Sequence, residues 1–398
     1  MRTVSSTWTS RLAGLAGLSP ALLMTALLVM IAGMGFSIIL PFLPLYGEKL
    51  GATSAQLGWM VSSFAIASAF ASALGGRLAD QRGRRFVLAS GMGIFALATL
   101  LLAVAPNPLL FILFRFLEGI GYGLVLPTGN TIAQDLAPKE RRGTVLGTYA
   151  TITLLGTLIG PAVGGLLAEW LGYSALFFTV SGVALLAMVL ALRVVPETSR
   201  PMCGAKTGTT PRLVLTPPLI AAYVAAGAVS LNNGLMQVVE VLFFRARYAV
   251  GVELIGVAFS CIAVAAILAR LPGGFLVDRL GPRTMLFAGL LLSGAATAAI
   301  AIMPTFIAAV GASALGAFFG VLAFSAIPVV IVENVEGSLR GRANGVMGVL
   351  ASIGLIIGAP IGTALYTTQV SLPFWTAGVT FAVAAFIVIL MLRRPETT

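Results

Sequence analysis

Two acidic residues, Glu118 and Glu240, lie within long apolar stretches of the sequence. A carboxyl group in such surroundings can take up and release a proton, and ionisable groups inside a membrane are costly to keep without a function. Arg115 precedes Glu118 by three residues, so the two side chains share one face of a helix and can pair. All three residues are therefore candidates for proton coupling. A purely structural Arg115–Glu118 pair remains an alternative.

A cluster of amides precedes Glu240. Gln237 and Glu240 share a helical face with Asn233, at i+4 and i+7, so the three side chains could face one cavity. Aromatic and thioether side chains near these acids could line an adaptable apolar pocket. The candidate substrate-cavity residues are Asn232, Asn233, Gln237, Tyr122, Phe36 and Met236, with Tyr149 and Tyr223 as weaker candidates. Alternatively, the amides only bond neighbouring helices and the aromatic rings face lipid or core.

Composition indicates which elements must position these groups. Of the 398 residues, 59% are hydrophobic and 9% are charged, whereas soluble domains contain about 25% charged residues. A helix needs about 20 apolar residues to cross the hydrocarbon core of a membrane. The sequence therefore predicts an all-α membrane protein. Its predicted helices are 20–46, 55–75, 86–105, 109–134, 143–168, 174–195, 217–244, 254–272, 284–303, 305–332, 341–367 and 373–392.

The charged residues indicate orientation in the membrane. With the N-terminus placed inside, 20 of the 24 lysines and arginines fall in predicted cytoplasmic segments and three in outer loops. The positive-inside rule then places both termini in the cytoplasm. The formal charge of +11 follows from these loops, so no nucleic-acid partner is expected.

Groups that commonly hold metals or act as general bases are scarce. The chain has no histidine and two cysteines, Cys203 in a predicted inner loop and Cys261 in a predicted helix. Zinc sites and nucleophilic catalysis usually need histidine or clustered cysteine. We expect neither an enzyme nor a cofactor.

The two halves of the chain resemble each other at an offset of 198 residues. The offset aligns Gly76 with Gly274, Asp80 with Asp278, and Gly160 with Gly358. The repeat predicts an N-terminal six-helix bundle (1–195), a cytoplasmic linker (196–216) and a C-terminal six-helix bundle (217–398). Duplicated halves are typical of transporters that rock one half against the other.

The repeated loop has a mechanical interpretation. It reads Gly-Arg-Leu-Ala-Asp-Gln-Arg-Gly-Arg-Arg from Gly76 to Arg85 and recurs from Gly274 to Arg283. Gly76 and Gly83 are expected to form a tight turn, and acids there could face a helix N-terminus. Basic residues could pair across the halves, so the candidate gating residues are Asp80, Gly76, Gly83, Arg84, Arg85, Asp278, Arg142 and Arg340. Alternatively, these charges only solvate a loop and enforce orientation.

A third pattern lies in the stretch 143–168. Gly156, Gly160 and Gly164 recur at i, i+4 and i+8, which clears one helix face for another backbone, and Pro161 and Gly165 complete the pattern. Pro161 removes one amide donor and permits a bend.

These motifs carry a resemblance to a known family. The Gly76–Arg85 loop resembles the loop signature of the major facilitator superfamily, and Gly156–Gly165 looks like the motif of its antiporter branch. Gly35, Pro41 and Pro44 have a spacing similar to that of twelve-helix drug/proton antiporters. The stretch Arg115–Gly119 resembles the family motif Arg-x-x-Gln-Gly, with Glu118 in place of the glutamine.

The resemblance implies two pseudo-symmetric six-helix bundles with a substrate cavity between the halves. It implies a proton-coupled exporter of small, largely apolar molecules or drugs that works by alternating access, as a monomer in the bacterial inner membrane. It also implies that Asp80 latches the cytoplasmic gate. From the residues themselves we expect Glu118 to carry the proton and Arg115 to affect its protonation, because Glu118 lies deeper in its predicted helix than Glu240 and Arg115 is within pairing reach. A dedicated carrier of one metabolite, lipid or metallophore shares every motif, and a membrane-embedded enzyme or receptor is a rival from another class.

Overall fold

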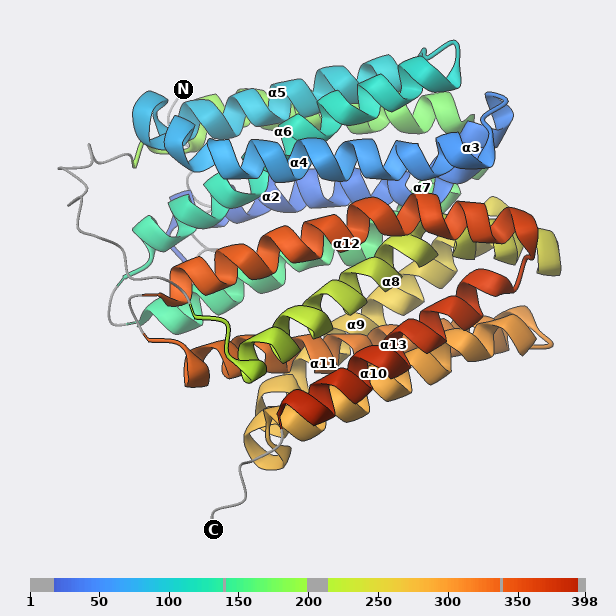
Figure 1. Ribbon diagram of the computed structural model, residues 1–398. Helices are drawn as coiled ribbons and strands as arrows, with labels where there is room; N and C mark the ends of the chain where they lie inside the picture. The colour runs from blue at the N-terminus through green and yellow to red at the C-terminus, as the bar shows by residue number, and fades with distance from the viewer. Residues whose placement is uncertain (1–17, 139–140, 199–213, 337–338, 393–398) are drawn as a thin grey trace. The chain divides into compact units, whose positions relative to one another are not determined.

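The computed structural model describes residues 18–138, 141–198, 214–336 and 339–392, and nearly all of them are helical (Figure 1). The helices of the N-terminal half are α2 (Pro20–Ile39), η1 (Leu40–Phe42), α3 (Leu43–Lys49), α4 (Ser54–Arg82), α5 (Arg84–Ala103), α6 (Pro108–Leu136) and α7 (Arg142–Val194). Those of the C-terminal half are α8 (Pro217–Tyr248), α9 (Val252–Leu280), α10 (Pro282–Ala299), η3 (Ile300–Ile302), α11 (Phe306–Asn334), α12 (Arg340–Thr368) and α13 (Leu372–Met391).

Eleven helical segments of the described residues are long and apolar enough to cross a membrane. One of them, α7, has 53 residues and contains a break at Gly172, where φ is 79° and ψ is 166°. Glycine adopts this backbone conformation readily because it has no Cβ. The two parts of α7 correspond to the predicted helices 143–168 and 174–195. The predicted all-α membrane fold is confirmed.

Local sequence explains where the helices begin. Asn107 accepts a hydrogen bond from the backbone N–H of Leu110 at the start of α6, and Thr305 does the same for Ala308 in α11. Such side-chain caps satisfy amides that have no partner inside the helix. Proline stands in the first turn of α6, α8 and α10. Proline has no backbone N–H, and at this position that group would have no partner inside the helix.

The prediction that the chain turns at Gly76 is wrong. Gly76 lies inside α4, which continues to Arg82, and Gly274 lies inside α9, which continues to Leu280. The chain turns instead at Gly83 and Gly281, where φ is +94° and +79°. Positive φ is unfavourable for residues with a Cβ, so the second glycine of each loop makes the turn.

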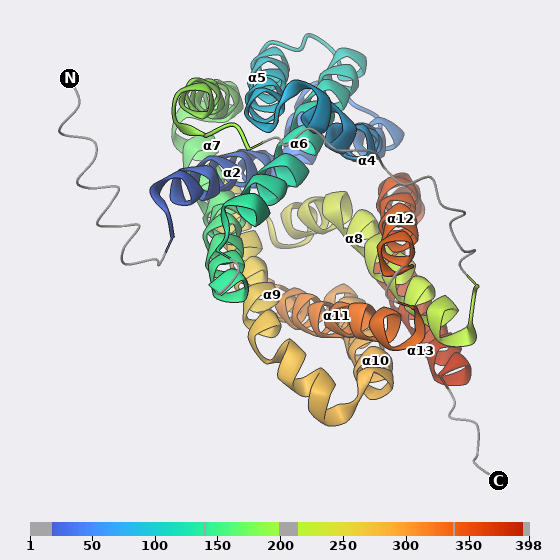
Figure 2. The ribbon, with the colours of Figure 1, turned by 90° about the vertical axis from the view of Figure 1, so that its left-hand side faces the viewer.

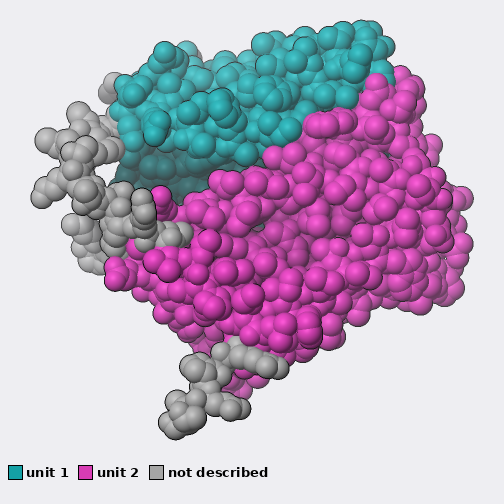
Figure 3. All heavy atoms as spheres, in the orientation of Figure 1, with its two compact units in different colours: residues 1–46, 63–206 teal, residues 47–62, 207–398 magenta. Residues whose placement is uncertain are grey.

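The chain divides into two compact units, coloured separately in Figure 3. Unit 1 comprises residues 1–46 and 63–206, and unit 2 comprises residues 47–62 and 207–398. Within unit 2, residues 47–62 are joined to α12 by a hydrogen bond from Ser62 Oγ to the Ile356 carbonyl, at 2.5 Å. Most of the predicted linker lies outside the described residues, so the predicted domain boundaries stay a prediction.

The two units repeat the same helix pairs. In unit 1, α2 packs against α7 and α5 packs against α6 and α7. In unit 2, α8 packs against α12, and α10 packs against α11 and α13. The end-on view shows α11 beside α10 and α9 (Figure 2). This correspondence agrees with the internal repeat read from the sequence.

Glycines allow the closest of these contacts. A Cβ added at Gly164 of α7 would lie 2.5 Å from the Ile38 carbonyl oxygen of α2. Its counterpart Gly362 of α12 would meet the Leu235 carbonyl oxygen of α8 at 2.6 Å. Gly156 and Gly160 meet α2 in the same way, at Met30 and Ser37, and Pro161 and Gly165 of α7 are buried. Small residues thus let two backbones approach in each unit.

Candidate functional site

Arg115 and Glu118 form an ion pair inside unit 1. Both lie on α6, with 1% and 0% of their side chains exposed, and Arg115 Nη1 donates to Glu118 Oε2. Thr99 of α5 donates from Oγ1 to Glu118 Oε1 at 3.1 Å. The Arg115 guanidinium lies over the ring of Phe64, 4.5 Å from its centroid. The carboxylate therefore has a counter-charge and a further donor, and the pair is sealed from solvent.

Phe36 and Tyr122, predicted as cavity residues, pack beside this pair. Their ring centroids lie 4.9 Å apart, and those of Phe36 and Phe64 lie 4.8 Å apart. Phe95 of α5 adds a fourth ring, 6.5 Å from Tyr122. Phe36 and Tyr122 remain half-buried. These side chains fill the space around Arg115 with aromatic rings, an arrangement that also stabilises a guanidinium through cation–π contact.

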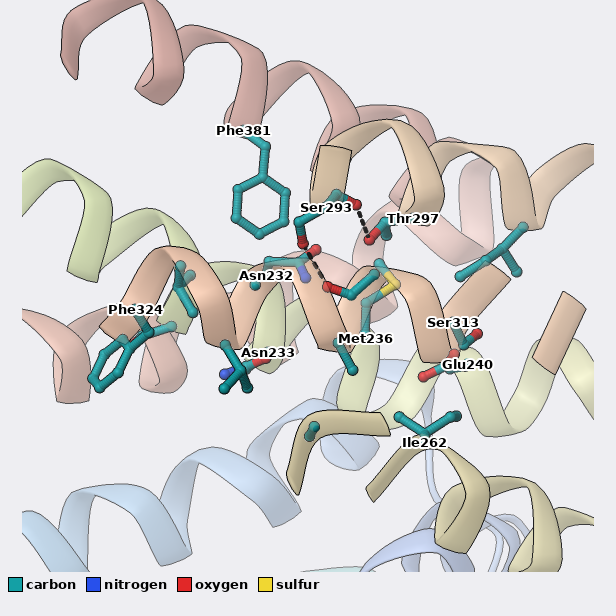
Figure 4. A pocket seen from close by; sticks show the side chains of 18 of the residues that line it. Asn232, Asn233, Met236, Glu240, Ile262, Ser293, Thr297, Ser313, Phe324 and Phe381 are labelled. Carbon is teal, nitrogen blue, oxygen red and sulfur yellow. Dashed lines mark hydrogen bonds between the residues drawn. The ribbon is translucent and has the colours of Figure 1, made fainter. Parts of the chain in front are cut away.

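A cavity of about 530 Å³ lies within unit 2. Its walls come from α8, α9, α10 and α11, with single residues from η3, α12 and α13 (Figure 4). On α8 the lining residues Asn232, Met236 and Glu240 recur at i, i+4 and i+8, and Asn233 also contributes. Gln237, which the sequence grouped with Asn233 and Glu240, is outside the cavity lining.

The cavity wall carries separated charges and an unsatisfied polar atom. Glu240 is 7% exposed and makes no ion pair with any residue that the structure describes. Ser313 of α11 lies next to Glu240, and Phe324 lies toward the other end of the cavity (Figure 4). Asn232 Oδ1 is buried and has no hydrogen-bond partner within the described part of the chain. Arg270 of α9 is the basic residue of the lining.

The weaker aromatic candidates lie elsewhere. Tyr223 donates a hydrogen bond to the Ala343 carbonyl at 3.1 Å inside unit 2. Tyr149 is buried in an apolar cluster of α2, α6 and α7 in unit 1. Neither residue lines the cavity of unit 2.

The first loop motif forms a charge cluster inside unit 1. Arg84 lies 3.9 Å from Asp80 and forms a second ion pair with Asp135 at the end of α6. Glu197, which follows α7, accepts hydrogen bonds from the backbone N–H groups of Arg84 at 2.7 Å and Arg85 at 3.3 Å. An anion at the N-terminus of α5 is favourable because the helix dipole is positive there.

The second copy of the loop differs. Pro282 occupies the position of Arg84, so Asp278 lacks that basic neighbour. Arg283, the counterpart of Arg85, donates to the Ile389 carbonyl of α13 at 3.4 Å. The charge cluster is thus specific to unit 1.

Arg142 and Arg340 make the same local contact in their own units. Arg142 donates to the Gln134 carbonyl of α6 at 3.1 Å, and Arg340 donates to the Val332 carbonyl of α11 at 2.8 Å. These acceptors are again 198 residues apart. Each arginine therefore satisfies free carbonyls at the end of the preceding helix.

Sequence reasoning missed Asp135, Glu197, Thr99, Ser313 and Arg270. Asp135 could have been found, because the repeat places an acid, Glu333, at the same point of the second half. Arg270 lies near the end of the predicted helix 254–272, and only the packing of α9 shows that it reaches the cavity. Within the described residues no cluster of three or more His, Cys, Asp or Glu side chains could hold a metal ion.

Known proteins resemble this chain in sequence and in fold. Residues 25–247 and 222–398 match the Major Facilitator Superfamily. Multidrug resistance protein MdtG of Escherichia fergusonii is 31% identical over 363 residues, which cover 84% of this chain and 85% of the relative. MdtG of Citrobacter koseri is 31% identical over 355 residues, with 84% and 85% coverage.

A solved structure has the same fold. It is a bacterial homologue of the human lysosomal transporter Spinster, in an inward-facing and occupied conformation. The TM-score is 0.77 at 17% sequence identity, with 93% of this chain and 96% of the other covered.

Proposed function

Because the chain belongs to the Major Facilitator Superfamily, a family of membrane transport proteins, we propose that it exports small, largely apolar molecules or drugs in exchange for protons. The MdtG relatives are named for multidrug resistance, which supports drugs as the substrate class. The excess of basic residues in predicted inner loops supports a cytoplasmic membrane location with both termini inside. The protein would act as a monomer and draw its energy from the proton gradient.

The observation that supports proton coupling is the carboxyl group of Glu240, which lies in the wall of a cavity and makes no ion pair with a residue that the structure describes. A proton carrier must change its protonation state between the two access states, because each state then has a different proton affinity. Glu118 is poorly suited, since its protonation would remove the negative charge that it holds against the buried guanidinium of Arg115. Glu240 has no such constraint, and Arg270 is the other charged group of its cavity. We therefore assign proton exchange to Glu240 and a structural role to the Arg115–Glu118 pair.

The charge cluster at the first loop is the proposed gate element. Asp80 and Asp135 both contact Arg84, and Glu197 holds the start of α5. A conformational change that moves the start of α5 away from α4, from the end of α6 and from the segment after α7 would break these contacts together. The cluster would thereby bias the protein toward one access state.

Inside-out membrane vesicles test the assignment. We expect Glu240→Gln to abolish uphill, gradient-driven uptake while energy-independent substrate exchange continues, because shape and hydrogen bonding are kept. Glu253→Gln, the same change at the start of α9 and outside the cavity lining, should transport like the parent. If Glu118→Gln loses uphill uptake and Glu240→Gln does not, the proton site belongs on α6.

Substrate breadth distinguishes the exporter from a dedicated carrier. In a strain without its own efflux pumps, expression should raise resistance to several unrelated toxic compounds. Resistance to none of them, together with transport of one metabolite or lipid, would establish the dedicated carrier instead.

A further inference from the structure

The cavity of unit 2 occupies the position that large side chains fill in unit 1. At the offset of 198 residues, the cavity residues Ser313, Gly316 and Gly320 correspond to Arg115, Glu118 and Tyr122. Two further lining residues, Ser293 and Ile262, correspond to Phe95 and Phe64. The lining residue Thr297 corresponds to Thr99, which donates to Glu118.

The filling of unit 1 indicates what this space can hold. Its occupants are a guanidinium paired with a carboxylate, and the rings of Phe64, Phe95 and Tyr122 packed around them. In unit 2 the rings and the cation are replaced by serine, glycine and isoleucine, and the carboxylate is supplied from α8 by Glu240. Relative to unit 1, the cavity of unit 2 therefore lacks a cationic group and the aromatic rings that pack around it, and an organic cation with an aromatic body could supply both.

We propose that the unit 2 cavity binds an organic cation with an aromatic or similarly apolar body. The cationic group pairs with Glu240 beside Ser313, and the body packs on Met236, Ile262 and Phe324. The free Asn232 Oδ1 offers an acceptor to a polar substituent. The volume of about 530 Å³ lies within the range of about 300–1,000 Å³ found for small-molecule sites.

The charge of the ligand follows from the surroundings of Glu240. Glu240 has Ser313 beside it but no counter-charge among the described residues. A carboxylate in a low-dielectric cavity without a counter-charge is unfavourable, and a bound cation relieves that cost as Arg115 does for Glu118. Rings beside the cation add favourable contact area, as in unit 1. Binding of the cation is argued from the cavity alone, and only the statement that the cation is a transported substrate rests on the proposed function.

Equilibrium binding to the purified full-length protein in detergent, without any gradient, tests the site. The probe is tetraphenylphosphonium, compared with neutral triphenylphosphine oxide. We expect Glu240→Gln to weaken binding of the cation by about tenfold or more, as for loss of a desolvated charge pair. The matched control Glu253→Gln should bind it as the parent does, and the neutral compound should not distinguish parent from Glu240→Gln.

Thiol labelling locates the probe. A Ser313→Cys variant, with Cys203 and Cys261 replaced by serine, should lose reactivity with a thiol reagent when tetraphenylphosphonium is bound. A Cys203→Ser variant that keeps exposed Cys261, outside the cavity lining, should stay reactive. Unchanged labelling of the Ser313→Cys variant at saturating probe would overturn the proposal.

The two proposals fail separately. If Glu240→Gln binds the cation like the parent yet loses gradient-driven export, the cation site is wrong and the proton assignment stands. If Glu240→Gln loses cation binding while uphill export of a neutral substrate continues, the cation site stands and the proton assignment is wrong.

Discussion

Glu118 and Glu240 are both buried carboxyl groups, but their surroundings differ. Glu118 has Arg115 and Thr99 as partners and no exposed surface. Glu240 lies in a cavity wall with no ion pair among the described residues. A paired, sealed carboxylate stabilises a fold or fixes a helix, whereas an unpaired one that faces a cavity can exchange a proton or bind a cation.

Replacing one member of the Arg115–Glu118 pair should harm stability more than replacing both. Arg115→Met leaves a buried carboxylate without its counter-charge, a cost of about 3–5 kcal/mol. The double variant Arg115→Met with Glu118→Leu removes both charges and should recover much of that loss. Thermal unfolding of the purified variants in detergent measures which variant is the less stable.

A double variant that unfolds at a lower temperature than either single variant would contradict this account. It would mean that the charges stabilise the fold beyond their mutual neutralisation.

At the scale of helices, glycines decide where two backbones meet. Gly358→Ala on α12 should destabilise unit 2, because the new Cβ would lie 2.5 Å from the Leu231 carbonyl oxygen and α8 must shift. Gly345→Ala, on the same helix with no atom within 4 Å of the added Cβ, is the matched control. It should be neutral or gain up to about 1 kcal/mol from higher helix propensity. Equal unfolding temperatures for the two variants would refute the close-packing role.

The turn before α5 offers a second prediction at this scale. Gly83→Ala should impair folding, because φ is +94° and a Cβ would crowd the carboxylate of Glu197, with Cδ at 2.9 Å. Glu197→Ala removes only the cap of α5 and should cost about 0.5–2 kcal/mol. Membrane abundance and thermal stability measure both effects. A Gly83→Ala variant as stable as the parent would show that the turn tolerates a side chain.

The sequence predicted the helices better than their ends or the site. Crossing lipid requires long apolar runs, so their number and order could be read directly. The ends of α4 and α9 were placed too early, because Gly76 and Gly274 are followed by polar residues that remain helical. Gln237 was grouped with Glu240 from helical periodicity alone, and only the packing of α8 against its neighbours determines that Asn232 lines the cavity. The pairing of Arg84 with Asp135 joins α5 to α6, a long-range contact that spacing does not reveal.

At the scale of the whole molecule, the two repeats differ at one equivalent position, which large side chains fill in unit 1 and which is a cavity in unit 2. The two units share helix pairs, glycine crossings and arginine caps. They differ where unit 1 has Arg115, Glu118, Phe95 and Tyr122, because unit 2 has serine or glycine at the corresponding positions. Duplication thus preserved the scaffold while the chemistry diverged.

Membrane orientation is a prediction for the complete chain. Single cysteines at Lys206, Arg279 and Arg340 should be reactive only from the cytoplasmic side, and those at Lys49 and Arg247 from outside, because basic loops stay inside. Labelling of intact cells with a membrane-impermeant thiol reagent, in a background without Cys203 and Cys261, measures this. Labelling at Arg279 from outside intact cells would overturn the topology.

The most direct test of proton-coupled export is proton movement driven by substrate. Purified protein in liposomes that contain a pH-sensitive dye is given a compound whose toxicity the protein reduces, with no imposed pH gradient. Downhill entry of the compound should drive protons out and raise the internal pH, and Glu240→Gln should abolish that change while the compound still exchanges. Transport of the compound by the parent protein with no change in internal pH would contradict proton coupling.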